Sequence, residues 1–93
     1  MQVYHEEILQ TCFEKLVEDL EPNPVMRYLY QKGIITEEDM YAIRSNDTRC
    51  KMNDALILQL KRKGPNAFKR FVEGLQKNQP FLADILLDEG KTV

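Results

Sequence analysis

The sequence is poor in the residues on which most catalytic and metal sites depend. His5 is the single histidine, and the two cysteines, Cys12 and Cys50, have neither a CxxC spacing nor a histidine partner nearby. A multi-histidine metal site and a Cys-His nucleophile pair are therefore both poorly supplied. The phosphate-binding patterns GxGxxG and GxxxxGK[ST] and the nucleophile pattern GxSxG are also absent. These absences predict a protein that is not an enzyme and has no catalytic residue, metal or cofactor.

Long apolar runs are missing as well. No run approaches the roughly 18–20 apolar residues that a membrane span needs, and the first ten residues, MQVYHEEILQ, lack the basic and apolar regions of a secretory signal. The cysteines lie in apolar-periodic surroundings, which favours reduced thiols. We therefore expect a soluble domain with no membrane partner, in the cytoplasm, with the nucleus as a second location.

The length and composition predict a single domain. With 93 residues and 43% hydrophobic content, the chain can form one core that buries roughly 60–65% of the surface of the unfolded chain. We expect the domain to cover residues 1–88 and a polar tail or linker to cover residues 89–93.

Apolar residues recur at helical spacing along the whole chain, and no stretch alternates with the period of a strand. The pattern predicts an all-α protein of six helices with short links. The expected helices cover residues 3–20, 24–32 and 37–45, then a fourth from about Arg49, a fifth from Pro65 and a sixth from Pro80.

Start and stop signals separate these helices. Asn23 can cap the second helix with Pro24 at its first position, and Gly33 can end it in a left-handed conformation. Thr36 and Asp39 have the spacing of a capping box at the start of the third helix.

The stretch LKRKGPNAFKRFVEGL, residues 60–75, joins the fourth and fifth helices. Gly64 is predicted to end the fourth helix and Pro65 to open the fifth. Phe68 and Phe71 are then expected to lie in the core against two leucines of the fourth helix, Leu56 and Leu60.

Charge is distributed unevenly along the sequence. Residues 1–21 hold six acids against one lysine, residues 37–48 hold four acids against one arginine, and residues 49–70 hold seven basic residues against one acid. Each cluster alone is typical of a solvated helix end. Together they also suggest head-to-tail association between oppositely charged faces. Nucleic-acid binding by the basic stretch is an alternative, against which stand the pI near 5.4 and the acidic first helix.

Several motifs resemble the caspase recruitment domain (CARD), a branch of the death-fold superfamily. These are LYQKGIIT at residues 29–36, the junction KGPNAFKRF at residues 63–71 followed by Leu75, and LVEDL at residues 16–20. The likeness runs from about residue 5 to residue 88 and is greatest to the CARDs of RAIDD-type adaptors and of initiator caspase prodomains.

The resemblance implies a six-helix antiparallel Greek-key bundle, often with a bent first helix, and no active site. Its implied function is homotypic association, in which one CARD recruits or oligomerises initiator caspases or adaptors in apoptotic or inflammatory signalling. The implied partners are another CARD-containing protein, whether caspase, adaptor or sensor, or copies of the chain itself. A CARD-only decoy regulator is an alternative.

The contact best known in the family joins basic residues on the first and fourth helices of one domain to acidic residues on the second and third helices of another. Carried over to this chain, the partner-binding acids are Glu37, Glu38 and Asp39. The partner-binding basic residues are Arg49, Lys51, Lys61, Arg62 and Lys63. The chain departs from the pattern in three places: only Lys15 is basic in its first helix, its fourth helix carries Asp54, and its second helix bears Arg27 and Lys32 in place of acids.

Overall fold

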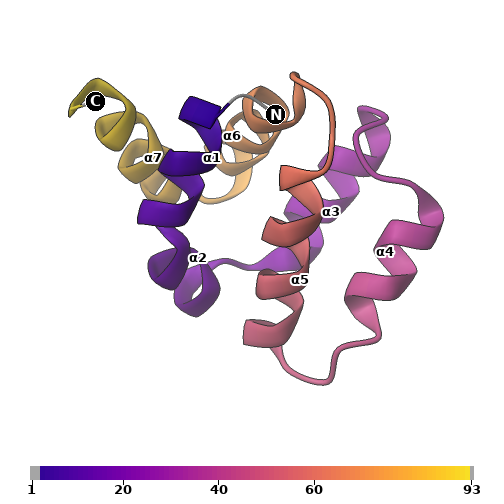
Figure 1. Cartoon of the computed structure of the whole chain (residues 1–93). Coiled ribbons are helices and arrows are strands. Elements are labelled where there is room, and N and C mark those ends of the chain that lie inside the picture. Colours follow the sequence, from indigo (N-terminus) through magenta and orange to yellow (C-terminus); the bar gives the residue numbers. More distant parts are fainter. Residues whose placement is uncertain (1–2, 93) are drawn as a thin grey trace.

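The computed structural model describes residues 3–92 and the side chains of residues 3–90, so Met1, Gln2 and Val93 of the predicted domain and tail lie outside it. This part of the chain forms seven helices and contains no strand (Figure 1), which confirms the all-α prediction. The helices are α1 (Val3–Thr11), α2 (Phe13–Asp19), α3 (Pro22–Gln31), α4 (Glu37–Arg44), α5 (Arg49–Lys61), α6 (Ala67–Asn78) and α7 (Pro80–Thr92). The antiparallel Greek-key order stays a prediction.

The expected count of six helices is wrong, because the first predicted helix is divided at Cys12. This residue departs from helical geometry, with φ −94° and ψ 6°. The hydrogen bonds from Cys12 N to Ile8 O and from Leu16 N to Cys12 O, both 3.0 Å, nevertheless carry the helical path across the junction. Thr, Cys and Phe, the residues at the junction, are weak helix formers, so the chain can bend here at low cost.

Three other boundaries differ from those predicted. Helix α3 begins at Pro22 rather than Pro24, so Asn23 is a helical residue and not the cap. Helix α5 ends at Lys61, and α6 begins only at Ala67, so Gly64 and Pro65 form a link between them. Helix α7 does begin at Pro80, but it continues through the expected tail to Thr92.

The predicted stop and start signals around α4 are confirmed. Gly33 has a φ of +76°, the left-handed conformation that glycine adopts without strain. Thr36 and Asp39 form a full capping box: Thr36 Oγ1 accepts from Asp39 N at 3.1 Å, and Asp39 Oδ2 accepts from Thr36 N at 2.9 Å. These contacts fix the start of α4 and the direction of its first-turn acids.

One continuous hydrophobic cluster joins all the helices. Phe68 and Phe71 both belong to it and are 7% and 0% exposed, together with Leu56 and Leu60 of α5. This confirms that both phenylalanines are buried in the same core as the two leucines, and their direct contact stays a prediction.

A buried asparagine links α5 to the end of α2. Asn53 is 0% exposed, and its Nδ2 donates to the carbonyl oxygens of Leu20 at 2.8 Å, Val17 at 3.0 Å and Leu16 at 3.4 Å. The last carbonyls of a helix have no partner within it, so this side chain takes the place of a cap.

A glutamine makes a similar link between two breaks in the chain. The side chain of Gln79, between α6 and α7, accepts from Glu21 N at 2.7 Å and donates to Glu21 O at 3.0 Å. It thereby pairs both backbone groups of the residue that precedes α3.

Helices α3 and α6 approach closely at Gly74. A Cβ added there would lie 3.1 Å from Cδ2 of Tyr28, so the ring occupies the space that a side chain would need. The ammonium groups of Lys32 and Lys77 lie 5.6 and 4.9 Å from the centroid of the same ring, within cation–π range.

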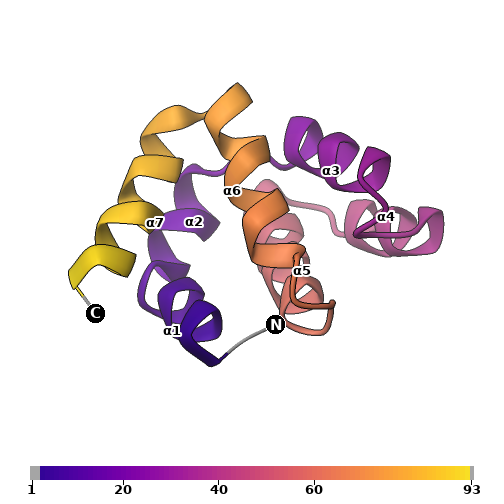
Figure 2. The same ribbon diagram turned by 90° about the horizontal axis from the view of Figure 1, so that it is seen from above.

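The helices are arranged as two end groups with a central pair between them. In both views α1, α2 and α7 lie at one end and α3 and α4 at the other, with α5 and α6 between them (Figures 1 and 2). A hydrogen bond of 2.5 Å from Tyr4 Oη to the Gly90 carbonyl joins α1 to α7.

Candidate protein-protein interface

The predicted acidic residues occupy the first turn of α4. Glu37 and Glu38 are exposed. Asp39 is turned inward, with 16% of its side chain exposed, and its Oδ2 lies 2.6 Å from Nζ of Lys63. The hydrogen bond from Lys63, aided by the backbone N–H of Thr36, holds the pKa of Asp39 below its usual value. Glu37 and Glu38 are therefore the members of this group that can reach a partner directly.

The predicted basic residues at the end of α5 also differ from one another in exposure and in ion pairing. Lys63 is bound to Asp39, whereas Arg62 is exposed and Lys61 is half-buried. The Lys63–Asp39 ion pair brings the end of α5 next to the beginning of α4. The acids of α4 and the cations of α5 thus lie at neighbouring helix ends, an arrangement that their separation in sequence did not predict.

The basic residues at the start of α5 are engaged within the molecule. The guanidinium of Arg49 donates to Glu21 Oε1 at 2.7 Å and to the Glu18 carbonyl at 2.8 Å, so it links α5 to the end of α2. Lys51 lies 3.2 Å from Asp47 in an exposed i,i+4 pair. Exposed pairs contribute only about 0–1 kcal/mol to folding, so a partner could exchange with either of them.

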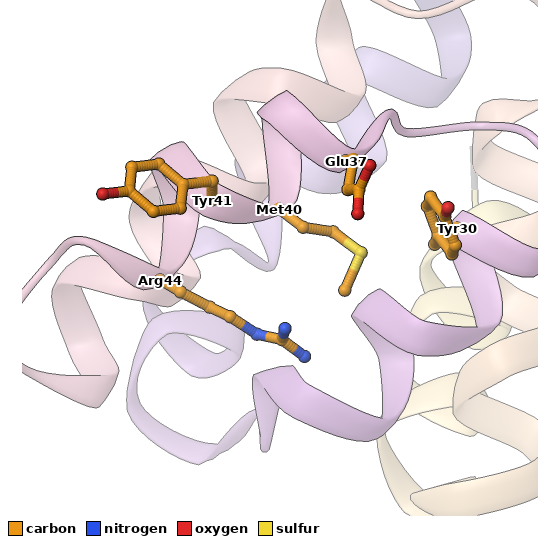
Figure 3. A pocket seen from close by; sticks show the side chains of 5 residues that line it. All are labelled: Tyr30, Glu37, Met40, Tyr41 and Arg44. Carbon is orange, nitrogen blue, oxygen red and sulfur yellow. The ribbon is translucent and has the colours of Figure 1, made fainter.

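A shallow depression between α3 and α4 was not predicted from the sequence. It has a volume of about 330 Å³ and is lined by Tyr30, Glu37, Met40, Tyr41 and Arg44, which we call the aromatic depression. Figure 3 shows Tyr30 of α3 and Met40 and Arg44 of α4 directed toward a common space, with the ring of Tyr41 turned outward. The two tyrosines are 47% and 79% exposed. The α4 members stand at positions i, i+3, i+4 and i+7, a helical face that the sequence does contain.

A smaller depression of about 200 Å³ lies between α4 and α5. Leu58 lines it and is 48% exposed. Arg62 lies at the same depression, so the basic end of α5 borders an exposed apolar side chain.

The two cysteines and the histidine lie in separate surroundings. Cys12 and Cys50 are free thiols, and burial, aided by Glu89, raises the pKa of Cys12. The His5 ring stacks on Phe68 with centroids 4.3 Å apart. Within residues 3–92, no group of three or more His, Cys, Asp or Glu side chains is arranged to hold a metal ion. In the same part of the chain, no helix has the length and apolar character to cross a bilayer.

The helices described above belong to a known class of interaction domain. The chain matches the model of the caspase recruitment domain over residues 6–89, and it belongs to that family. The CARD is a non-catalytic domain that interacts with other CARD-containing proteins. The chain is also 34% identical over 88 residues to Caspase-2 of Gallus gallus. That alignment covers 94% of this chain and 21% of the chicken protein, so the chain spans about a fifth of its relative's length.

Proposed function

We propose that the chain recruits an initiator caspase or an adaptor by binding that protein's CARD through charged surface residues. The proposal is carried by the family match over residues 6–89, and the likeness to Caspase-2 supports a role like that of a caspase prodomain in apoptotic signalling. The proposed site of action is the cytoplasm, with neither nucleic acid nor membrane as a partner.

The residues best suited to this contact are the members of the predicted groups at the neighbouring ends of α4 and α5 that are outside the Lys63–Asp39 ion pair. The exposed Glu37 and Glu38 present carboxylates at the start of α4, and the half-buried Lys61 and the exposed Arg62 present cations at the end of α5. The ion pair between Asp39 and Lys63 holds the beginning of α4 next to the end of α5, so the two groups stay close together. Each exposed ion pair across an interface contributes little alone, so binding would depend on several pairs and would weaken with salt.

The test mixes the purified chain with the CARDs of candidate caspases and adaptors and measures binding by calorimetry. We expect Glu37→Lys/Glu38→Lys or Lys61→Glu/Arg62→Glu to raise the Kd about tenfold or more, because attraction becomes repulsion. Asp84→Lys/Asp88→Lys on α7 is the matched control, since both residues are exposed and the change in net charge equals that of the α4 variant. Equal affinity of both site variants and the wild type would overturn the role given to these charges, and binding to no CARD would overturn the function.

Nucleic-acid binding is tested separately. The proposal predicts no shift of duplex DNA or RNA by the chain at low salt, where phosphate contacts are strongest. A salt-sensitive shift that Lys61→Glu/Arg62→Glu abolishes would favour the nucleic-acid alternative instead.

A further inference from the structure

Tyr41 presents its ring and hydroxyl to solvent more fully than the other tyrosines do. It is 79% exposed, against 47% for Tyr30, 40% for Tyr4 and 9% for Tyr28. The hydroxyl of Tyr4 is engaged in the hydrogen bond to α7, whereas the Tyr41 side chain forms no hydrogen bond in the described part of the chain. Figure 3 shows the Tyr41 ring turned outward, while Tyr30 is directed toward the space between α3 and α4. The phenol oxygen of Tyr41 is therefore accessible to an enzyme.

The residues before Tyr41 carry negative charge. Glu37, Glu38 and Asp39 stand four, three and two positions before it. The two glutamates are exposed and form no ion pair within residues 3–92. Together with Tyr41 they line a shallow depression of about 360 Å³, so the tyrosine and both carboxylates border the same space. Kinases select their substrates partly by such charge patterns, because a basic surface at the catalytic cleft attracts acids close to the acceptor.

Helix α4 buries few side chains around Tyr41. Ile43 is the one buried residue of this helix, whereas the longer α6 buries six. Tyr41 lies in the last turn of α4, four residues before the beginning of the link at residues 45–48. A segment with few buried side chains opens locally at low cost, and a short helix is marginally stable by itself. A catalytic cleft can therefore close around the Tyr41 side chain while the core stays folded.

We infer that Tyr41 is a phosphorylation site for a tyrosine kinase that selects acidic residues before its target. In the reaction, the phenol oxygen of Tyr41 forms a bond to the γ-phosphorus of ATP, and the bond between that phosphorus and the leaving ADP breaks. The phenol proton passes to a carboxylate of the kinase. The product carries a charge of about −1.5 to −2 at pH 7.

The phosphate enlarges the acidic surface that Glu37 and Glu38 form. These two carboxylates supply two negative charges, so the phosphate roughly doubles the charge of the surface. This part of the inference rests on the proposed function, in which the same surface meets basic residues of another CARD. The added charge strengthens that attraction. Arg44, which is exposed one turn further along α4, offsets part of the gain because its guanidinium can bind the phosphate.

The experiment incubates the folded chain with Mg²⁺, ATP and the catalytic domain of a tyrosine kinase that prefers acidic residues before the tyrosine. Mass spectrometry then locates the phosphate. We expect Tyr41 to carry nearly all of it, so Tyr41→Phe should abolish incorporation and Tyr30→Phe should leave the rate unchanged. Glu37→Gln/Glu38→Gln should lower the rate about tenfold, because two ion pairs with the kinase are lost.

A charge control and the distribution of the phosphate separate a specific site from general reactivity. Asp84→Asn/Asp88→Asn removes the same charge at exposed positions of α7 and should keep the wild-type rate. No incorporation into the wild type, or equal rates for the two double variants, would overturn the inference. Equal phosphorylation of all four tyrosines would also overturn it, because it would show that the kinase acts on the unfolded chain.

Calorimetry then compares the phosphorylated and unmodified chains in binding to one partner CARD. We expect phosphorylation to lower the Kd about threefold to tenfold at about 0.15 M salt and to have little effect at about 1 M salt, where the charges are screened. An unchanged or higher Kd would overturn the regulatory role given to the phosphate. If Tyr41 is phosphorylated but neither form binds any CARD, the proposed function fails and the phosphorylation site stands. If the unmodified chain binds a CARD and Tyr41 is not phosphorylated, the proposed function stands and this inference fails.

Discussion

At the scale of single residues, Asn53 shows how one buried side chain can end a helix to which it does not belong. Its amide pairs with the last carbonyls of α2 from the middle of α5. This link could not be predicted from the sequence, because the partners of Asn53 lie 33–37 residues away.

Replacement of Asn53 by alanine should lower the free energy of unfolding by about 1–3 kcal/mol, since buried carbonyls lose their donor. Asn53→Asp keeps the shape but replaces the donor with oxygen atoms, so we expect it to be at least as destabilising at neutral pH. Urea denaturation checks both, with the exposed neighbour Asp54→Ala as the control. A loss no greater than that of the control would show that the three hydrogen bonds do not stabilise the fold.

The two cysteines should react at very different rates. Burial raises the pKa of the Cys12 thiol and also limits access to it, whereas Cys50 is exposed. With a thiol reagent under native conditions, we expect one fast reaction and one slow reaction. Cys50→Ser should remove the fast phase and Cys12→Ser should leave it; the reverse assignment would contradict the described burial.

At the scale of elements, α4 should give the protein part of its sensitivity to acid. Lys63 and the Thr36 N–H lower the pKa of Asp39 in the folded state, so the unfolded chain, whose aspartate titrates near 3.9, takes up the proton first. The contribution of Asp39 is therefore complete above that value and is lost as the pH falls through the lower folded pKa.

The corresponding measurement is stability against pH. Between about pH 6 and pH 3, the wild type should lose more free energy of unfolding than Asp39→Asn does. Glu38→Gln, an exposed change on the same helix turn, should keep the wild-type slope. Parallel curves for wild type and Asp39→Asn would rule out the ion pair with Lys63 as the cause.

The cap itself can be tested apart from the ion pair. Thr36→Ala should cost about 1 kcal/mol, since it removes the acceptor for Asp39 N. Thr36→Ser, which keeps a hydroxyl at the same place, should restore most of the loss in a thermal melt. Equal melting temperatures for wild type and Thr36→Ala would refute the capping role.

The helices that were predicted best are those whose limits depend on local chemistry. The capping box of Thr36 and Asp39, the left-handed Gly33 and the initial Pro80 act within a few residues, so their pattern is visible in the sequence. The break at Cys12 is not visible in the apolar spacing, which continues through it, and only the family resemblance implied a bend in the first helix. The start of α3 was placed two residues late because both prolines suit a first turn, and only the link from Gln79 to Glu21 favours the earlier one.

At the scale of the whole molecule, a single core predicts a single unfolding transition. The cluster includes Leu9 of α1 and Leu82 of α7, both 0% exposed. Leu9→Ala and Leu82→Ala should each cost about 2–5 kcal/mol and lower the same transition, observed together by circular dichroism and tyrosine fluorescence. Two separate transitions in either variant would show that the ends unfold independently.

The candidate interface was less predictable than the fold. Whether a charged side chain is available to a partner depends on ion pairs with residues that are distant in sequence. Asp39 and Lys63 were both expected to face a partner, yet they are 24 residues apart and bind each other. Arg49 likewise binds Glu21 across 28 residues. Four of the predicted residues remain available to a partner: Glu37, Glu38, Lys61 and Arg62. Their part in binding stays a prediction.

Gly74 sets the distance between α6 and α3, because only a residue without a side chain leaves room there for the Tyr28 ring. In an isolated helix, alanine would be favoured over glycine by about 1 kcal/mol, but here its methyl group would meet the Tyr28 ring at 3.1 Å. A larger residue would therefore act as a wedge that pushes α3 outward from α6. Graded substitution from glycine to alanine to serine would then adjust the tilt of α3 relative to α6 without altering a charged residue of the surface.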